Sequence, residues 1–121
     1  MSKVVQKIKH IVEIILYDLN LGTGHAFHEI MTKISAPLHR EAGLDILAFG
    51  PSLHDKDTYF LIRAFDTTDQ MASVLNTFYN SDDWKNGPRS SILGSIKTSK
   101  RSVMHLDPAA ISALKESFKQ G

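Results

Sequence analysis

The chain has 121 residues, a formal net charge of +1 and a hydrophobic fraction of 42%, which are typical of one soluble domain. The absence of cysteine excludes disulfides, thiolate zinc sites, iron–sulfur clusters and cysteine nucleophiles. The balance of 14 Lys+Arg against 13 Asp+Glu favours small-molecule or protein partners over nucleic acid. No apolar run reaches the length of a membrane span or a signal peptide, so we expect a cytoplasmic protein.

The first third of the chain predicts a strand followed by a helix. Residues 10–18 are rich in β-branched side chains and precede a turn-forming segment, which is typical of a strand. From Thr23, the expected N-cap, apolar residues recur at helical spacing. Pro37 is expected to kink or divide this helix, and Gly43 is expected to end it.

The remaining elements follow from changes in period and from turn residues. Two strands, at residues 44–49 and 58–65, are separated by a loop and predict a hairpin. Helical stripes then recur after cap signals at Asp66 and Thr67 and at residues 81–84, and again after Pro88, ending with Ile92, Leu93 and Ile96. Residues 98–106 predict the last strand, and residues 107–121 a terminal helix whose apolar face is Ile111, Leu114 and Phe118.

The order of these elements predicts the fold class. A β-α-β-β-α-β order with an extra C-terminal helix is that of an α+β, ferredoxin-like domain, in which helices cover one face of an antiparallel sheet. We find no internal repeat and no linker, so residues 1–121 are expected to form one domain, with residues 1–9 as an N-terminal tail.

Both faces of two central strands carry apolar side chains, although helices are expected on only one face. Alternate residues of the strands at 10–18 and 58–65 are apolar on either side, apart from Glu13 and Arg63. The second face therefore needs a cover. We expect a two-fold homodimer in which sheet packs on sheet; the alternative is that the terminal helix folds back over this face.

Two segments resemble the NIPSNAP family of dimeric α/β-barrel proteins. They are residues 43–65 and residues 78–89, and the second contains Phe78-Tyr-x-Ser-x-x-Trp-x-x-Gly-Pro-Arg89. The resemblance implies a ferredoxin-like protomer and a sheet-to-sheet dimer, and it implies no reaction. Related barrels include cofactor-free monooxygenases, haem-degrading enzymes and small-ligand binders. Ile15 stands where an arginine is common in the family, so a charge cluster built there is expected to be weaker.

Glu13 and Arg63 are the sharpest candidates for a functional site. Each is the one charged residue within an otherwise apolar central strand, and a buried charge demands a partner. One interpretation is a structural ion pair. The other is that Arg63 binds an anionic or carbonyl-bearing ligand with Glu13 orienting it, in a cavity also lined by Tyr17 and Tyr59.

The segment around Trp84 allows two interpretations as well. A single Trp between short helices is most often a plug between helices and sheet. Alternatively, Trp84 and Tyr79 form a pocket wall, and Arg89, near a helix start, helps to hold an anion.

Six histidines raise the question of a metal. His25 and His28 are three residues apart, but no third ligand lies at a useful spacing, and both fall beside the apolar face of the helix. His39, near the end of the same helix, could interact with its carbonyls. No histidine follows Trp84 on the next helix, which disfavours haem. We expect no metal and no cofactor.

Two functions remain open at the level of sequence. The first is a dimeric protein of unassigned activity that binds a small molecule in a pocket between helices and sheet. The second is a cofactor-independent enzyme of the monooxygenase type acting on a planar or carbonyl-bearing small molecule. A cavity near Glu13, Tyr17, Arg63 and Trp84 would discriminate between them, because the enzyme needs a site.

Overall fold

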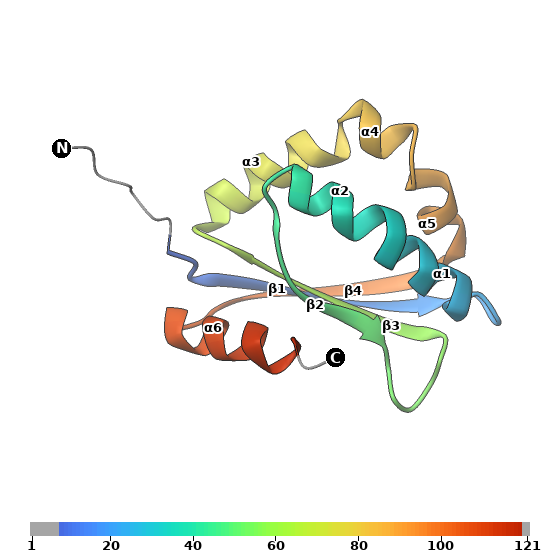
Figure 1. The fold of residues 1–121 in the computed structure, drawn as a ribbon, viewed down its shortest axis with the longest axis horizontal. Coiled ribbons are helices and arrows are strands. Elements are labelled where there is room, and N and C mark those ends of the chain that lie inside the picture. The colour runs from blue at the N-terminus through green and yellow to red at the C-terminus, as the bar shows by residue number, and fades with distance from the viewer. Residues whose placement is uncertain (1–7, 120–121) are drawn as a thin grey trace.

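Four strands form one antiparallel sheet in the computed structural model, which describes residues 8–119 (Figure 1). The strand order is β2-β3-β1-β4, so β3 and β1 are central and β2 and β4 are edges. This is the order of a ferredoxin-like sheet, and the predicted fold class is confirmed. The strands are β1 (Ile11–Leu19), β2 (Asp45–Pro51), β3 (Thr58–Phe65) and β4 (Ile96–His105).

Helices lie on both faces of this sheet, in unequal numbers. Figure 1 shows all but the last on one face, and α6 alone on the other. None of the helices described within residues 8–119 is long and apolar enough to cross a membrane. The helical segments are α1 (Gly24–Ile30), the π-helical η1 (Met31–Ser35), α2 (Ala36–Glu41), α3 (Thr68–Tyr79), α4 (Asp82–Lys85), α5 (Arg89–Ser95) and α6 (Pro108–Ser117).

The run from α1 to α2 is the single helix predicted from the sequence, divided as expected before Pro37. In η1 the N–H of Ala36 reaches the carbonyl of Met31, five residues back. This wider turn comes just before Pro37, whose ring would collide with a carbonyl of the preceding turn in a regular α-helix. Gly43 ends the helix with φ +83°, and the N–H of Leu44 reaches the carbonyl of His39, which makes a Schellman motif.

The start of α1 is held by a residue that the sequence analysis did not single out. Thr23 occupies the predicted N-cap position, but its hydroxyl donates to the carbonyl of Asn20 and bonds no helix amide. Asp57, from the β2–β3 loop, accepts from the N–H groups of Gly22 and Gly24 at 2.9 Å each. These bonds lower the pKa of the Asp57 carboxyl below its usual value.

The later boundaries agree with the predictions except at β4. Of the two capping candidates before α3, Thr67 accepts from the N–H of Gln70 and caps the helix, whereas the side chain of Asp66 pairs with Lys9. Ser81, in the second expected cap segment, accepts from the N–H of Trp84 and caps α4. Ile96, predicted to continue a helical stripe, is instead the first residue of β4, two residues before the predicted start. It pairs with Leu19 across a bulge, so pairing with β1 overrides the local helical period.

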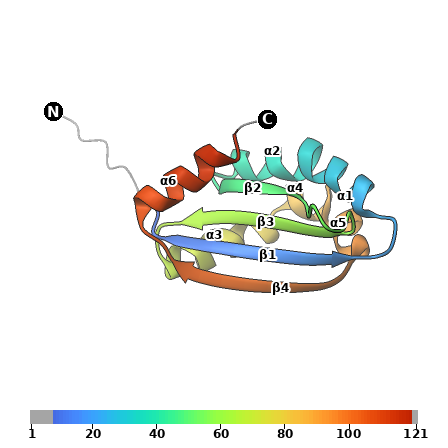
Figure 2. The same ribbon diagram turned by 90° about the horizontal axis from the view of Figure 1, so that it is seen from below.

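The terminal helix covers part of the second face, which corrects the expectation that a partner subunit must cover all of it. The turn at Asp107 and Pro108 sends α6 back across the sheet (Figure 2). There Ile111 is 4% exposed and packs with Val12, Ile62 and other apolar residues. Further along the same face Leu16 is 48% exposed and Met104 38%. The folded-back helix was the alternative in the sequence analysis, and it holds for this part of the face. Residues 1–7 and 120–121, from the predicted tail and the end of the predicted helix, lie outside the described residues.

Candidate functional site

The charged pair predicted from the central strands is present and enclosed. The register places Glu13 opposite Arg63, with Tyr17 opposite Tyr59 on the same face. Arg63 donates from Nε to Oε1 of Glu13 at 2.6 Å, and both side chains are 1% exposed. A buried ion pair depends on further hydrogen bonds, because both ions have lost their hydration.

Helices α2 and α3 supply those further bonds to Arg63. Its Nη1 donates to Nε2 of His39 at 2.9 Å and to the hydroxyl of Tyr79 at 2.8 Å. Although burial works against the charged guanidinium, Tyr79 and Glu13 outweigh it and raise the pKa of Arg63. The arginine therefore carries a permanent charge at the boundary between sheet and helices.

His39 is a neutral acceptor in this network. Its Nδ1 lies 2.7 Å from the carbonyl of Ser35, and a carbonyl can only accept, so Nδ1 carries the proton and Nε2 is free to accept from Arg63. Burial lowers the pKa of His39 to about 4, while the bond to Ser35 acts in the opposite direction. The predicted bond to a helix carbonyl is thus present, but the larger role of His39 is toward Arg63.

A second guanidinium reaches Glu13 from β4. Arg101 donates from Nε to Oε2 of Glu13, and its side chain is 48% exposed. Arg101 is the cross-strand partner of Ile15, the position at which the family resemblance led us to expect a missing arginine. The neighbouring strand thus supplies a second guanidinium beside Ile15.

The charged residues form the floor of an open hollow of about 380 Å³ between α3 and the edge of the sheet at β4. Two carboxamides from the end of α3 and the residue after it, Asn76 and Asn80, lie on its rim. The polar residues that line the hollow are Glu13, Arg63, Tyr79, Arg101, Asn76 and Asn80. The hollow thus combines two guanidiniums, one carboxylate, one phenol and two amides.

Tyr17 and Tyr59 share the face of this cluster but do not line the hollow. Both contact Phe27 through ring-edge or tilted packing, and burial raises the pKa of each phenol above its usual value. The hydroxyl of Tyr59 lies 2.6 Å from Nδ1 of His28. His28 is therefore half-buried and oriented, in contrast to the surface position expected for it.

Trp84 and Arg89 are not brought into the hollow. Trp84 is buried and packs edge-on against Tyr79 with ring centroids 5.1 Å apart, as expected for a plug between helices and sheet. Arg89 is the exposed first residue of α5. Within residues 8–119, no group of three His, Asp or Glu side chains is placed to hold a metal ion.

The sequence analysis missed Arg101 as a member of the site and missed the role of His39. Arg101 carries a usable signal, since it is two residues from Val103, the partner of Glu13, and diagonal neighbours on paired strands lie within reach of long side chains. Using it would have required the β1–β4 register. His39 shows no local signal, because it meets Arg63 only when α2 packs on the sheet.

Solved structures of similar fold include several NIPSNAP proteins. A NIPSNAP family protein of unknown function from Agrobacterium tumefaciens has a TM-score of 0.73 at 16% identity, over 84% of this chain and 90% of that one. A NIPSNAP-like domain protein from Burkholderia xenovorans gives 0.72 at 12%, over 82% and 85%. A Nitrosomonas europaea protein, named for the antibiotic biosynthesis monooxygenases, gives 0.60 at 17%, over 78% and 95%. No protein-family model and no curated protein matches the sequence.

Sheet order, helix placement and the enclosed charge cluster define a ferredoxin-like α+β protein. Its fold is that of the NIPSNAP proteins, as the resemblance of residues 43–65 and 78–89 predicted. At these identities the comparison establishes the fold and assigns no activity to the chain.

Proposed function

We propose that this protein binds a small organic anion in the hollow over Glu13, Arg63 and Arg101. The observation that carries the proposal is the charge of the floor: one carboxylate lies between two guanidiniums, which leaves an excess positive charge. Asn76 and Asn80 add neutral hydrogen-bonding groups at the rim. A few polar groups converging on a hollow of a few hundred Å³ is the usual form of a small-molecule site.

Arg101 is the residue best placed to meet the ligand. It is half-exposed, and one of its N–H groups is engaged by Glu13, which fixes the plane of the guanidinium. Arg63 is buried and already donates hydrogen bonds to Glu13, His39 and Tyr79. Its charge therefore acts on the ligand mainly through the local electrostatic field. A carboxylate or a polarised carbonyl oxygen is the group that such a site would hold.

A ligand screen tests this proposal directly. The probes are acetate, pyruvate, benzoate and inorganic phosphate, first by thermal shift and then by calorimetric titration of those that raise the melting temperature. Arg101→Gln should weaken binding by about tenfold or more, because a charge-assisted hydrogen bond is lost. The fold should persist, since Arg101 is half-exposed.

Lys100→Gln is the matched control, because Lys100 precedes Arg101 on β4 and belongs to the opposite face of the sheet. It removes the same charge without touching the hollow. Equal weakening by both variants would mean that only the overall charge matters, and the proposed site would fail. Failure of every probe to raise the melting temperature would also contradict it.

We also propose that the protein is a homodimer that uses the part of the second face not covered by α6. Leu16 and Met104 are exposed there, and residues 97–105 of β4 are exposed on both of its faces. A partner sheet would remove this apolar surface from water. The contribution of α6 makes the dimer interface smaller than a sheet-wide contact.

A cofactor-independent monooxygenase is the second candidate, favoured by the fold shared with the Nitrosomonas europaea protein. The groups near the hollow support it less well. Both oxygens of Glu13 accept from guanidiniums, and His39 is neutral and enclosed, so neither is a ready proton acceptor. Oxygen uptake in the presence of a hydroquinone, absent in Arg101→Gln, would favour the enzyme over the binding protein.

A further inference from the structure

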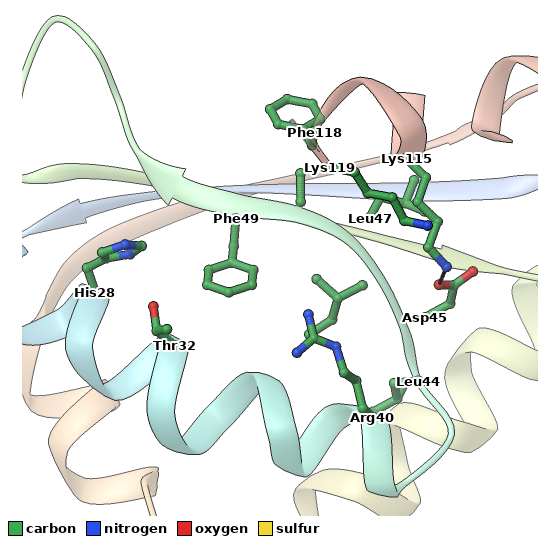
Figure 3. Close-up of a pocket in the computed structure, with 12 residues that line it drawn as sticks. His28, Thr32, Arg40, Leu44, Asp45, Leu47, Phe49, Lys115, Phe118 and Lys119 are labelled. Carbon is green, nitrogen blue, oxygen red and sulfur yellow. Dashed lines mark hydrogen bonds and ion pairs between the residues drawn. The ribbon is translucent and has the colours of Figure 1, made fainter. Parts of the chain in front are cut away.

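A second and larger groove, of about 590 Å³, follows the opposite edge of the sheet. It runs along β2, with side chains of α1, η1 and α2 on one side of the strand and side chains of α6 on the other (Figure 3). None of the charged residues that line the first hollow also lines this groove. The groove is therefore a separate feature of the molecule.

Its lining is positively charged with an apolar centre. Arg40, Lys115 and Lys119 line the groove together with one carboxylate, Asp45, which is paired with Lys115 at 2.9 Å. Lys119 lies 3.8 Å from Glu116. Arg40 has no ion pair among the described residues, and Figure 3 shows its guanidinium directed into the groove. A free guanidinium fork beside an apolar wall is suited to a planar carboxylate.

Between the two ends of the groove stands an aromatic ring. In Figure 3, Phe49 lies between Arg40 and His28, with Thr32 on the helix below. The ring centroids of Phe49 and His28 are 6.2 Å apart. A flat apolar group placed against Phe49 would thus have a cation at one end and polar side chains at the other.

His28 is oriented by Tyr59. The hydroxyl of Tyr59 lies 2.6 Å from Nδ1 of His28, so that ring nitrogen is engaged. Nε2 is the other ring nitrogen, and an imidazole nitrogen can exchange a hydrogen bond with a polar group of a ligand. The hydroxyl of Thr32 adds a group that both donates and accepts.

The free edge of β2 is poorly suited to an added peptide strand. A bulge interrupts the ladder between Ile46 and Ala48, and Pro51, which has no N–H, ends the strand. The backbone N–H of Ser52 donates to the carbonyl of Thr58 on β3. Because backbone groups alternate along an edge strand, the N–H and C=O of Gly50 and Ala48 also point toward β3, and between them only those of Phe49 point away from the sheet. A continuous ladder cannot form on such an edge, and a compact ligand fits it better.

We propose that this groove binds a small aromatic carboxylate. The carboxylate pairs with Arg40, the ring packs against Phe49, and a polar substituent on the ring bonds His28 and Thr32. Lys115 on α6 and Lys119 just after it add to the attraction of the anion from the other side of the strand. The site is independent of the proposed function, since it shares no residue with the hollow at Arg101.

Nitrogen-15 NMR titration with 4-hydroxybenzoate tests the proposal. Saturable shifts are expected at the amides of Phe49 and Thr32. Arg40→Gln should weaken the affinity by about tenfold or more. Phe49→Leu should weaken the binding of 4-hydroxybenzoate and leave the weak binding of acetate unchanged. The NMR spectrum of this variant checks that its fold is unchanged. 4-Hydroxybenzyl alcohol, which lacks the carboxylate, should bind more weakly than 4-hydroxybenzoate.

Two controls separate this groove from the hollow and from bulk charge. Lys97→Gln removes one exposed charge at the other edge of the sheet and should leave the affinity unchanged. Arg101→Gln should also leave it unchanged; if this variant alone weakens binding, the ligand occupies the hollow, so the groove proposal fails while the proposed function stands. Absence of saturable shifts, or strand-like shifts along β2 with an acidic peptide only, would overturn the groove proposal.

Discussion

The two faces of the sheet stabilise the same two central strands in different ways. On the face covered by α1–α5, Glu13 and Arg63 are enclosed together and bonded by side chains from α2, α3 and β4. On the other face, α6 buries only apolar residues around Ile111, and its ion pair, Lys115 with Asp45, stays half-exposed at the edge. A buried charge pair therefore requires several elements to satisfy it, whereas one short amphipathic helix suffices for an apolar contact.

Separating the buried pair should have the largest effect. Glu13→Gln leaves Arg63 and Arg101 without a counter-charge, and Arg63→Met leaves Glu13 with one partner; each should lower the free energy of unfolding by about 3 to 5 kcal/mol. The double variant should recover part of this loss. Urea unfolding measures all three.

Lys115→Gln is the control on the opposite face, where a half-exposed pair should contribute about 1 kcal/mol or less. If the losses of Glu13→Gln and Arg63→Met simply add in the double variant, the two residues are not energetically coupled. The contrast between the faces would then disappear.

The next largest effect is a dependence of the unfolding free energy on pH, which arises from His39 on the helix-covered face. The pKa of His39 is about 4 in the folded protein against 6.5 in a model peptide, so the unfolded chain binds more protons between these values. Stability should therefore fall as the pH drops from 6.5 to 4, by about 3 kcal/mol at most. His39→Gln, which keeps an acceptor for Arg63, should flatten that slope.

Unfolding by urea at several pH values compares the two proteins. Carboxylates titrating in the same range affect both, so the difference between the two curves is the quantity that reports His39. Identical slopes would show that His39 titrates normally and is not enclosed as described.

Removing the anchor of α6 should have a smaller effect. Ile111→Ala deletes buried methyl and methylene groups, and because a terminal helix can shift to close the gap, we expect a loss of about 2 kcal/mol. The pH slope assigned to His39 should be unchanged, since that residue lies on the other face. An unchanged unfolding free energy would mean that α6 does not dock on the sheet in solution.

The smallest effect on stability is expected at the open part of the second face. Leu16→Lys should convert the proposed dimer to a monomer while changing the stability of the protomer little, because Leu16 is 48% exposed. Light scattering on a sizing column measures the mass. Leu93→Lys, on α5 with a similar exposure of 50%, is the control and should leave the dimer intact. A wild-type protein that is monomeric at micromolar concentration would contradict the dimer.

Local periodicity determined most of the fold. The alternation in β1 and β3 identified both strands and placed Glu13 and Arg63 on one face, and the ferredoxin-like order then made them neighbours. Caps at Thr67 and Ser81 and the helix end at Gly43 were also readable, because each rests on a residue's own backbone and side-chain chemistry.

The tertiary structure alone decided which distant groups complete these local features. Asp57 in place of Thr23 at the start of α1, Arg101 beside Glu13, and His39 under Arg63 all join residues far apart in the chain. Periodicity shows which face a side chain takes, but not which residue of another element stands opposite it. That pairing depends on strand register and helix docking, which are set by the packing of the whole core.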